Sequence, residues 1–475
     1  MTRIFRSGAR AAAAPLVLLW LAGCASVDID KTLDQTNAAT PDFTQGKLEL
    51  SRTALQRGAR AKLSTELLAQ PLDMPSAVQL ALANSPTVQT LLAQSWADMA
   101  RADRGGRLAN PMFTFERMRL GDELEIGRLL SFGLLDLLTL PQKRAIASSQ
   151  VAQARLQLSA NVVEQVTQTR LAWVRAVGAQ QSLAYAKQVN ISAQASSELA
   201  KRMQQVGNFN KLQRARQQVF YADSAAQLAA SQHAATATRE ELTRLLGLTD
   251  AQATQLKLPD RLPDLPKEPR PAQTVNASAG EQRLDVQMAR QQLDAAGRSQ
   301  GLNLLTSLVD LELGLRRDTV FDNAESTQST RRGIELGIRL PIFDWGSASR
   351  DTMNAESLAA ASRYESTVRG ASSQLRESYS AYRTAWDVAR HYRDEIVPLR
   401  KIMAEENQLR YNGMLIGVFE LLADNREQIN SVIAAINSFQ QFWLADAALA
   451  ASLTGKPVNT LLAAPAKSGG QAAGH

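Results

Sequence analysis

The sequence predicts a mainly α-helical chain that also contributes β-strands to a membrane. Two observations predict the helices: stretches of tens of residues lack proline and glycine, and apolar residues recur within them at coiled-coil spacing. A third observation predicts the strands, since two pairs of segments alternate apolar with polar residues. The long helices are expected to form coiled-coil hairpins, and the strands to form hairpins in the membrane.

The N-terminus has the layout of a secretory signal peptide. Three arginines and no acidic residue lie in the first ten positions, and residues 11–22 are almost wholly apolar. This apolar run is too short to be a membrane-spanning helix. We therefore expect residues 1–23 to be a signal peptide.

Cys24 is the only cysteine of the chain and directly follows this run. A lone cysteine can form neither an internal disulfide nor a thiolate metal site. The tetrapeptide Leu-Ala-Gly-Cys at 21–24 resembles a bacterial lipobox, which implies that Cys24 is acylated, as with palmitate, and begins the mature lipoprotein. Ala25 follows instead of an aspartate, which in such lipoproteins implies the outer membrane. The alternative is an ordinary signal peptide cut nearby, with Cys24 unmodified.

Charge and composition argue against several classes of function. Removing residues 1–23 lowers the formal net charge from +7 to +4. The sequence lacks a basic run with interleaved aromatic residues, which argues against nucleic-acid binding. Beyond the signal peptide, the sequence contains no run of about 18 apolar residues, so no helical membrane span is predicted. Three histidines and one cysteine leave little for nucleophilic or metal chemistry. We expect no enzyme, no metal site and no cofactor besides the lipid on Cys24.

The chain repeats itself. Each half contains short helices, a strand pair, a very long helix, a glycine-containing turn, another long helix and a Leu-Gly or Thr-Gly stop. Five prolines between Pro259 and Pro271 exclude a helix from the segment that joins the halves, which is interpreted as an extended linker. The expected divisions after the signal peptide are a lipid-anchored segment at 24–72, the first repeat at 73–248, the linker at 249–278, the second repeat at 279–459 and a flexible tail at 460–475.

The ranges 142–206, 208–246 and 418–454 contain no proline, so each is predicted to form a long helix. In the second half Gly370 and Pro398 interrupt the helix before the tip, and a kink is expected near 398. At about 1.5 Å per residue, the first helix would reach on the order of 100 Å. Two seams have the 3.5-residue period of a coiled coil, although a helix-bundle core has similar spacing. They are Phe419, Leu422, Arg426, Ile429, Ile433, Ile436, Gln440 and Trp443, and Leu212, Ala215, Val219, Ala222, Ala226 and Ala229.

Two hairpins are expected, at about 112–137 and about 307–342. An alternation of apolar and polar residues with a period of two places one face of a strand toward an apolar medium and the other toward water. Each run has about the length of a strand that crosses a bilayer. A soluble sheet packed on helices would alternate in the same way. The charged residues expected to face a water-filled lumen are Asp310, Glu312, Arg316, Glu335 and Arg339, and those expected in an aromatic girdle are Phe321, Phe343 and Trp345.

Four strands cannot close a barrel. An open sheet edge cannot face lipid, because its N–H and C=O groups would lack hydrogen-bond partners. A single copy therefore cannot span the membrane with these strands, and several copies must pool them. The long helices would then continue the lumen as a tube.

The order of these elements behind a lipobox resembles the TolC-like outer-membrane efflux family. Similar motifs are LDMPSAVQLALANSP (72–86), with Asp73 as a helix N-cap and Pro75 in the first turn, and RLPIFDWGSASR (339–350) at the exit from the second hairpin. The two helical tips, QQVGNFNKLQRARQQ (204–218) and LRYNGMLIGVFELLADNREQIN (409–430), resemble those of the family as well.

The resemblance implies a homotrimer in the outer membrane. Each chain would give four strands to one twelve-stranded barrel and its helices to a periplasmic α-barrel. Such proteins are passive exit ducts that receive substrate and energy from an inner-membrane pump through a periplasmic adaptor, and they catalyse no reaction.

The resemblance also suggests where a periplasmic gate would lie. Family members often carry acidic rings after the second tip turn, and the first such position is Glu420. The second falls on Ala423, which departs from the pattern, although Asp424 is adjacent. The alternative is that Glu420 and Asp424 are solvated surface charges.

The tip turns are expected to dock the adaptor because they would expose glycine and apolar groups. Packing between neighbouring helices is the alternative. The residues concerned are Gly207, Asn208 and Phe209 in the first tip, and Gly413, Met414, Leu415, Ile416 and Gly417 in the second.

Three interpretations of function remain open at this stage: an efflux duct for small toxic molecules or metal ions, a duct for type I protein or peptide secretion, and a periplasmic coiled-coil lipoprotein without a channel. The membrane-length hairpins argue against the third. The stretches LTLPQKRAIA (138–147) and FNKLQRARQQ (209–218) resemble the heavy-metal branch of the family more than the multidrug branch.

Overall fold

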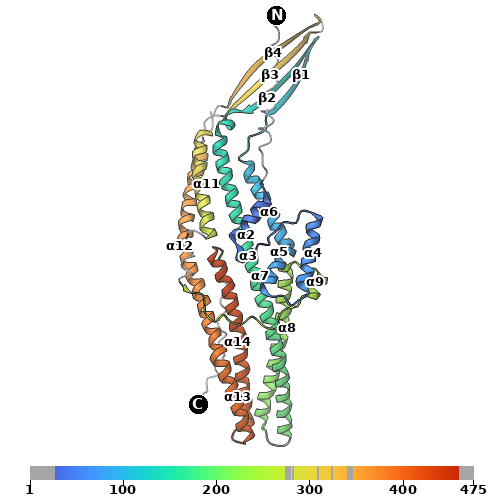
Figure 1. Cartoon of the computed structure of the whole chain (residues 1–475), viewed down its shortest axis with the longest axis vertical. Coiled ribbons are helices and arrows are strands. Elements are labelled where there is room, and N and C mark those ends of the chain that lie inside the picture. The colour runs from blue at the N-terminus through green and yellow to red at the C-terminus, as the bar shows by residue number, and fades with distance from the viewer. Residues whose placement is uncertain are drawn as a thin grey trace, which may run out of the picture. The chain divides into compact units, whose positions relative to one another are not determined.

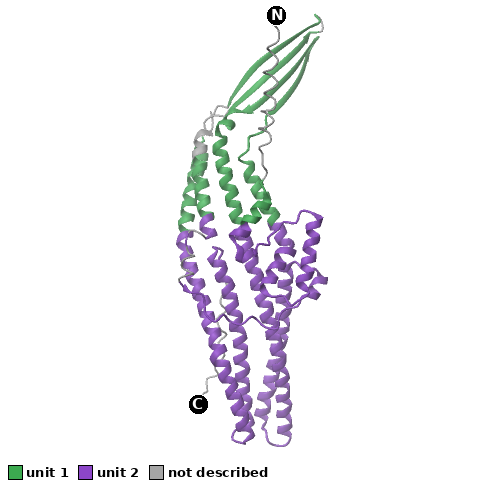
Figure 2. Ribbon diagram, in the orientation of Figure 1, with its two compact units in different colours: residues 1–35, 92–158, 288–366 green, residues 36–91, 159–287, 367–475 purple. Residues whose placement is uncertain are grey.

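The computed structural model describes residues 27–272, 280, 283–306, 310–322, 325–339 and 346–458. Cys24, Phe343 and Trp345 lie outside the described residues. The chain forms two compact units: unit 1 comprises residues 1–35, 92–158 and 288–366, and unit 2 comprises residues 36–91, 159–287 and 367–475 (Figure 2). Among the described residues, no helix has both the length and the hydropathy that crossing a bilayer requires.

The elements follow the expected order twice along the chain (Figure 1). The first set consists of α2 (Ile29–Ala39), α3 (Pro41–Thr44), α4 (Ala54–Leu68), α5 (Met74–Asn84), α6 (Pro86–Arg104), β1 (Met112–Leu120), β2 (Glu123–Gly133), α7 (Leu134–Gln205), α8 (Lys211–Leu246) and α9 (Asp250–Gln255). The second set consists of α11 (Leu284–Thr306), β3 (Asp310–Asp322), β4 (Thr327–Arg339), α12 (Ser347–His391), a π-helical turn (Tyr392–Ile396), α13 (Val397–Asn412) and α14 (Val418–Leu453).

The four strands of unit 1 form one antiparallel sheet in the order β1-β2-β3-β4. Gly121, with φ +58°, provides the backbone conformation of the tight turn between β1 and β2. The central β2–β3 pairing joins the hairpins of the two halves of the chain. The prediction of a mainly helical chain with four strands is therefore confirmed.

Two expected boundaries differ in the structure. The first hairpin ends at Gly133 and α7 begins at Leu134, so residues 134–137 are helical and the proline at position 141 lies inside α7. The hydroxyl of Thr139 donates a hydrogen bond of 2.7 Å to the carbonyl of Leu135 in the first turn of α7.

Helix α12 runs through Gly370 without interruption, contrary to expectation, because a single glycine weakens a helix but does not end it. The expected irregularity near Pro398 is present as the π-helical turn Tyr392–Ile396, which directly precedes α13.

The core of unit 2 lies where the short N-terminal helices pack on the long ones. Trp173 of α7 is fully buried and donates a hydrogen bond of 2.8 Å from Nε1 to the carbonyl of Leu72. Asp73 caps α5 as expected, since its Oδ1 accepts a hydrogen bond of 2.8 Å from the N–H of Ser76. A second cluster around Tyr382, Trp386 and Phe442 joins α12 to α14.

The linker is ordered along its described part, and the prediction that no part of it is helical is wrong. Residues 250–255 form α9, since Thr249 makes a capping box with Gln252 and the prolines begin only at 259. Beyond α9 the extended chain lies against α14 and α12. Trp443 and Trp386 of these helices donate indole hydrogen bonds of 3.0 and 3.2 Å to the carbonyls of residues 263 and 266.

The predicted seam of α8 is wrong for a single chain, whereas that of α14 is buried or half-buried throughout. All six α8 positions are exposed. In the tip-side part of this hairpin, the buried positions of α8 are Gln217, Ser224 and Ser231, and those of α7 include alanines at 186, 193 and 200. Small residues at seven-residue spacing let the two helices approach closely, and Asn190 donates a hydrogen bond of 3.1 Å to Ser224 Oγ across the hairpin.

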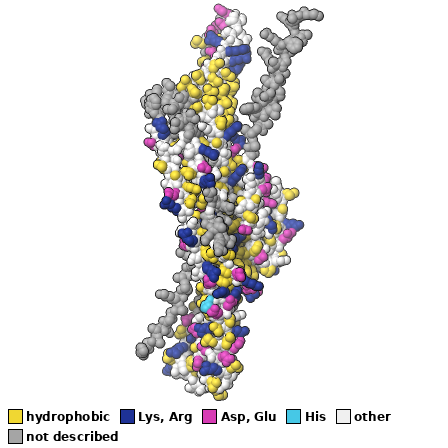
Figure 3. All heavy atoms as spheres, turned by 60° about the vertical axis from the view of Figure 1, so that its left-hand side comes forward, with side chains coloured by type: hydrophobic (Ala, Val, Ile, Leu, Met, Phe, Trp, Pro, Cys, Tyr) yellow, Lys and Arg dark blue, Asp and Glu magenta, His cyan; other side chains and the backbone are white. Residues whose placement is uncertain are grey.

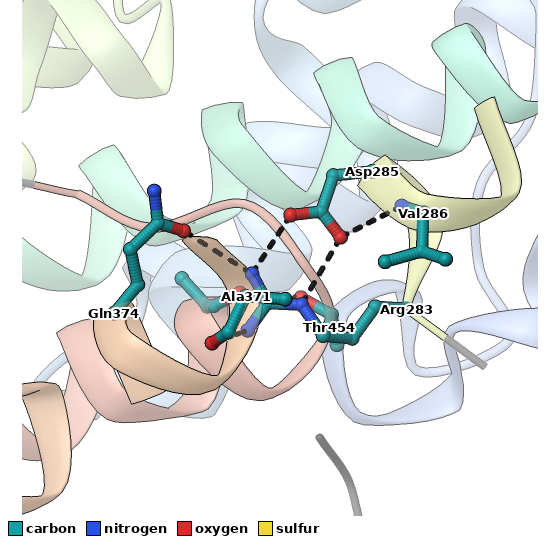
Figure 4. A network of polar contacts seen from close by, with 7 residues as sticks. Arg283, Asp285, Val286, Ala371, Gln374 and Thr454 are labelled. Carbon is teal, nitrogen blue, oxygen red and sulfur yellow. Dashed lines mark hydrogen bonds and ion pairs between the residues drawn. The ribbon is translucent and has the colours of Figure 1, made fainter. Parts of the chain in front are cut away.

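The start of α11 is fixed by a buried arginine (Figure 4). The guanidinium of Arg283 donates hydrogen bonds of 2.8 and 3.0 Å to the carboxylate of Asp285 and one of 3.1 Å to the carbonyl of Ala371. The N–H of Leu284 donates to the carbonyl of Thr454 at the end of α14. These contacts join the beginning and the end of the second repeat.

Candidate channel lining and helical tips

The sheet of unit 1 has two chemically different faces. The registers place all acidic residues of the strands on one face, which we call the polar face. They are Glu116, Glu123, Glu125, Asp310, Glu312, Asp318, Asp322 and Glu335. The register pairs Asp310 with Arg339, so all five residues predicted to face a lumen occupy this face. The sharing of one face follows from the pairing, and the lining of a lumen stays a prediction.

A cluster of charges lies at the centre of the polar face. Arg316 of β3 forms ion pairs of 2.8 Å with Asp318, 2.9 Å with Glu335 of β4 and 3.5 Å with Glu116 of β1. Gly127 of β2 lies between them, and a Cβ there would come within 3.3 Å of the Asp318 Oδ1 atom. Arg316 thus pairs with three carboxylates, and the register places Arg331 opposite Asp318 on the same face.

Sequence analysis missed Asp318 and Glu116 in this cluster. Asp318 lies two residues after Arg316 on the same strand, so the period of two was a signal that could have found it. Glu116 lies 200 residues away in the other hairpin. Only the pairing of the two hairpins through β2 and β3 brings it to Arg316.

The opposite face, which we call the apolar face, carries large hydrophobic side chains that are exposed in the single chain. Ile334 is 74% exposed, and its apolar neighbours across the sheet are exposed as well. The exposed members are Phe113, Phe115, Leu130, Leu315, Ile334, Leu336 and Ile338. A contiguous exposed apolar surface of this kind is typical of a face that contacts a membrane or another protein.

The two helical tips of unit 2 pack against each other through aromatic rings. Phe209 of the first tip is buried and stacks on Phe419 of α14, with 4.4 Å between the ring centroids. Ile416 is also buried. The expectation that Phe209 and Ile416 are exposed for docking is therefore wrong, because Ile416 is buried and Phe209 packs against Phe419 of the other tip hairpin.

The other predicted tip residues are exposed. Met414 is 93% exposed and has a left-handed backbone with φ +58°, and Leu415 is 73% exposed. Gly207 has φ +82° and allows the first turn. The exposed tip surface consists of Gly207, Asn208, Gly413, Met414, Leu415 and Gly417.

The two predicted gate residues have different surroundings. Glu420 is exposed in the first turn of α14, where the helix dipole favours a carboxylate. Asp424, one turn later, accepts a hydrogen bond from the amide of Asn407, which is buried on α13 of the same hairpin. Its carboxylate therefore has a partner within the chain, whereas Glu420 remains available to other groups.

Arg426 connects the two tip hairpins. Its guanidinium donates a hydrogen bond of 2.7 Å to Gln217 Oε1 of α8 and lies 4.3 Å from the ring centroid of Phe220. Burial lowers the pKa of Arg426, and the nearby Arg216 lowers it further. A charged residue at a coiled-coil seam position was the signal of this contact in the sequence.

Among the described residues, no group of three or more His, Cys, Asp or Glu side chains is placed to hold a metal ion. The charged clusters at the sheet and at the tip consist of carboxylates with arginine and amide partners.

Comparisons with known proteins fit this geometry. Residues 276–414, which include the second hairpin and the beginning of the second tip, match the family model of outer membrane efflux proteins. The chain has the fold of TolC-like outer-membrane efflux proteins. A membrane protein from Pseudomonas aeruginosa is similar with a TM-score of 0.68 and 20% identity, over 80% of this chain and 93% of that chain.

Two solved outer-membrane channels have the same TolC-like fold. CmeC of Campylobacter jejuni has a TM-score of 0.65 and 15% identity, over 85% of this chain and 87% of its own. The open state of MtrE of Neisseria gonorrhoeae has a TM-score of 0.65 and 18% identity, over 81% of this chain and 89% of its own. No curated protein matches the sequence.

Proposed function

We propose that this chain is the outer-membrane exit duct of a tripartite efflux system. The observation that carries the proposal is the four-stranded sheet, with all strand carboxylates on one face and exposed apolar side chains on the other. The apolar face of such a sheet suits contact with a lipid bilayer, and the polar face suits contact with a water-filled lumen. Its edge strands, β1 and β4, need partners from further copies before they can face lipid.

The proposed assembly is a homotrimer with twelve strands, in which the helices of unit 2 form a periplasmic tube. A periplasmic adaptor would contact the exposed tip surface around Met414, and an inner-membrane pump would supply energy and substrate. Acylation of Cys24 would add a lipid anchor in the outer membrane. The duct itself moves its cargo passively, and the cargo would be small toxic molecules or metal ions.

An export and conductance experiment tests the duct. We expect the purified full chain to be a trimer in detergent and to conduct in planar bilayers, and the mass of the mature chain to show the lipid on Cys24. Deleting the gene should sensitise the host to copper, zinc, cobalt or silver salts, or else to dyes, detergents and antibiotics, and the sensitive group identifies the cargo. A monomer without conductance would contradict the proposal, and loss of a secreted protein without any sensitivity would favour a secretion duct.

Glu420→Gln is expected to reduce cation selectivity without closing the duct. Three copies of Glu420 would place carboxylates around the narrow end, and their removal should lower the cation-to-anion permeability ratio at least about twofold at low salt. Reversal potentials in a salt gradient measure this ratio. Glu66→Gln, at an exposed glutamate of α4, is the matched control. An unchanged ratio in Glu420→Gln would show that this residue is an ordinary surface charge.

A further inference from the structure

The apolar face of the sheet changes character along the strands. One row across the four strands is wholly apolar and consists of Phe113, Leu130, Leu315 and Ile334. Two residues farther along each strand, the next row on the same face consists of Phe115, Arg128, Arg317 and Arg332. Arg117 and Arg119 continue the charge along β1, and together these five arginines form what we call the arginine belt.

The arginine belt has no counter-charge on its own face. Every position that the registers place on this face is apolar, basic or uncharged polar, because all acidic residues of the strands lie on the polar face. Among the described residues, no carboxylate forms an ion pair with the belt, and Arg128 reaches only the hydroxyl of Thr319 at 3.5 Å. Three neighbouring strands thus present like charges side by side, which destabilises a sheet unless an anion compensates.

The position of the belt identifies the end of the sheet at which that anion would be met. The row of Arg128, Arg317 and Arg332 lies near the middle of the strands, and Arg117 and Arg119 extend the belt toward the β1–β2 turn at Gly121. The apolar rows lie toward the other end, where β2 continues directly into α7 at Leu134. If the helices are periplasmic, the turn end faces the cell exterior, and the belt lies on the exterior side of the wholly apolar rows.

We propose that the arginine belt binds the phosphate groups of anionic lipids in the outer leaflet that surrounds the barrel. This inference rests on the proposed function, which turns the apolar face toward lipid. Arginine is suited to this role because its planar guanidinium binds phosphate through two parallel hydrogen bonds, while its aliphatic stem can lie along apolar surface.

The continuity of the two surfaces favours a lipid over another anion. Hydrophobic side chains gather over the strands with Lys and Arg side chains next to them (Figure 3). The occupant of this face therefore needs an apolar part beside the rows of Leu315 and Ile334 and a negative group beside Arg317 and Arg332. A phosphorylated lipid has both parts in this order, and free phosphate has only the second.

The experiment measures retention of lipid A, which carries two phosphates, by the full-length trimer. The protein is reconstituted in phosphatidylcholine with a small fraction of lipid A and extracted, and the bound lipid is counted by native mass spectrometry. The test variant is Arg317→Gln with Arg332→Gln. The matched control is Arg331→Gln, which alters the adjacent residue of the same strand on the polar face.

We expect the double variant to retain about 25-fold less lipid A, since each arginine near a membrane surface contributes about a fivefold preference for anionic lipid. The single variant Arg332→Gln, which removes one exposed side chain, should lose about fivefold and covers the case in which the double variant fails to fold. Arg331→Gln should retain as much lipid as the wild type. Dephosphorylated lipid A should bind the wild type weakly, and inorganic phosphate should not displace lipid A.

Equal retention by wild type and both test variants, with conductance intact, would overturn the inference and leave the duct unaffected. Displacement of lipid A by inorganic phosphate alone would also overturn it, because the belt would then be a simple anion site. A chain that neither trimerises nor conducts would instead contradict the proposed function.

Discussion

Gly247→Ala is expected to destabilise unit 2 by about 2–5 kcal/mol, which combines left-handed backbone strain with overpacking. Gly247 ends α8 with φ +65°. A Cβ there would lie 2.5 Å from Pro86 Cδ and 2.6 Å from Ser85 Cα, so the junction of α5 and α6 would have to move. That movement would also break the hydrogen bond of 2.8 Å from the amide of Asn84 to the carbonyl of Gly247.

The matched control for this prediction is Gly46→Ala. Gly46 has nearly the same backbone, φ +67°, but a Cβ there meets nothing within 4 Å. Its replacement should cost only the backbone strain of about 1–2 kcal/mol. Thermal melting of the full chain in detergent, followed by far-UV circular dichroism, compares the two variants. Equal melting temperatures would show that the junction yields easily and that the close approach at Gly247 is unimportant.

The same geometry occurs at the end of the second half of the chain. Gly455 follows α14 with φ +88°, and a Cβ there would lie 2.5 Å from Asp285 Oδ1 and 2.9 Å from the backbone nitrogen of Leu284. In both halves a left-handed glycine closes the last helix and lies against the beginning of the helix that leads to the hairpin. The repeat visible in the sequence is therefore a repeat of packing as well.

The strands could be predicted from the sequence because their pattern depends on local alternation. Leu311, Leu313 and Leu315 alternate with charged residues or glycine, and a strand turns such residues to opposite faces whatever its neighbours are. Two hairpins by themselves do not determine which of their strands pair with each other, and the structure joins them through β2 and β3. The Arg316 cluster was only partly predictable, because Glu116 reaches it through a pairing between the two hairpins.

The packing of α8 could not be predicted because its two possible seams follow the same period. Leu212 and Val219 form the more hydrophobic seam, and they are exposed in the single chain. The buried seam contains Ser224, which is small and accepts a hydrogen bond from Asn190 of α7, and Gln217, which accepts one from Arg426 of α14. Within the single chain the less hydrophobic seam of α8 is the buried one, because two helices that approach closely favour small side chains over large ones.

The tips show a similar limit. Phe209, Ile416, Met414 and Leu415 are all apolar residues in short turns, yet the first two are buried and the last two exposed. Which of them turns inward depends on the left-handed residues Gly207 and Met414 and on the ring of Phe419 across the tip. The sequence shows that the turns exist, and only the arrangement of two hairpins shows which side chains they present.

Arg283→Met is expected to destabilise the second repeat by about 3 kcal/mol, because it leaves the carboxylate of Asp285 without its buried partner. The Arg283 side chain is completely inaccessible to solvent and also bonds to Ala371 and Gln374 (Figure 4). The expected loss is at the lower end for a broken buried pair, since Asp285 is 22% exposed and water can reach it. The measurement is the melting temperature of the full chain in detergent.

Arg202→Met distinguishes this effect from the general loss of an ion pair. Arg202 pairs with Glu198 at 3.2 Å on the exposed surface of α7, and such pairs contribute about 0.2–1 kcal/mol. Arg283→Lys should recover little, because an ammonium group cannot make the paired hydrogen bonds to Asp285 and also reach the Ala371 carbonyl. If Arg283→Met and Arg202→Met melt alike, the junction between α11, α12 and the end of α14 is held by its backbone contacts, chiefly the bond from Leu284 to Thr454.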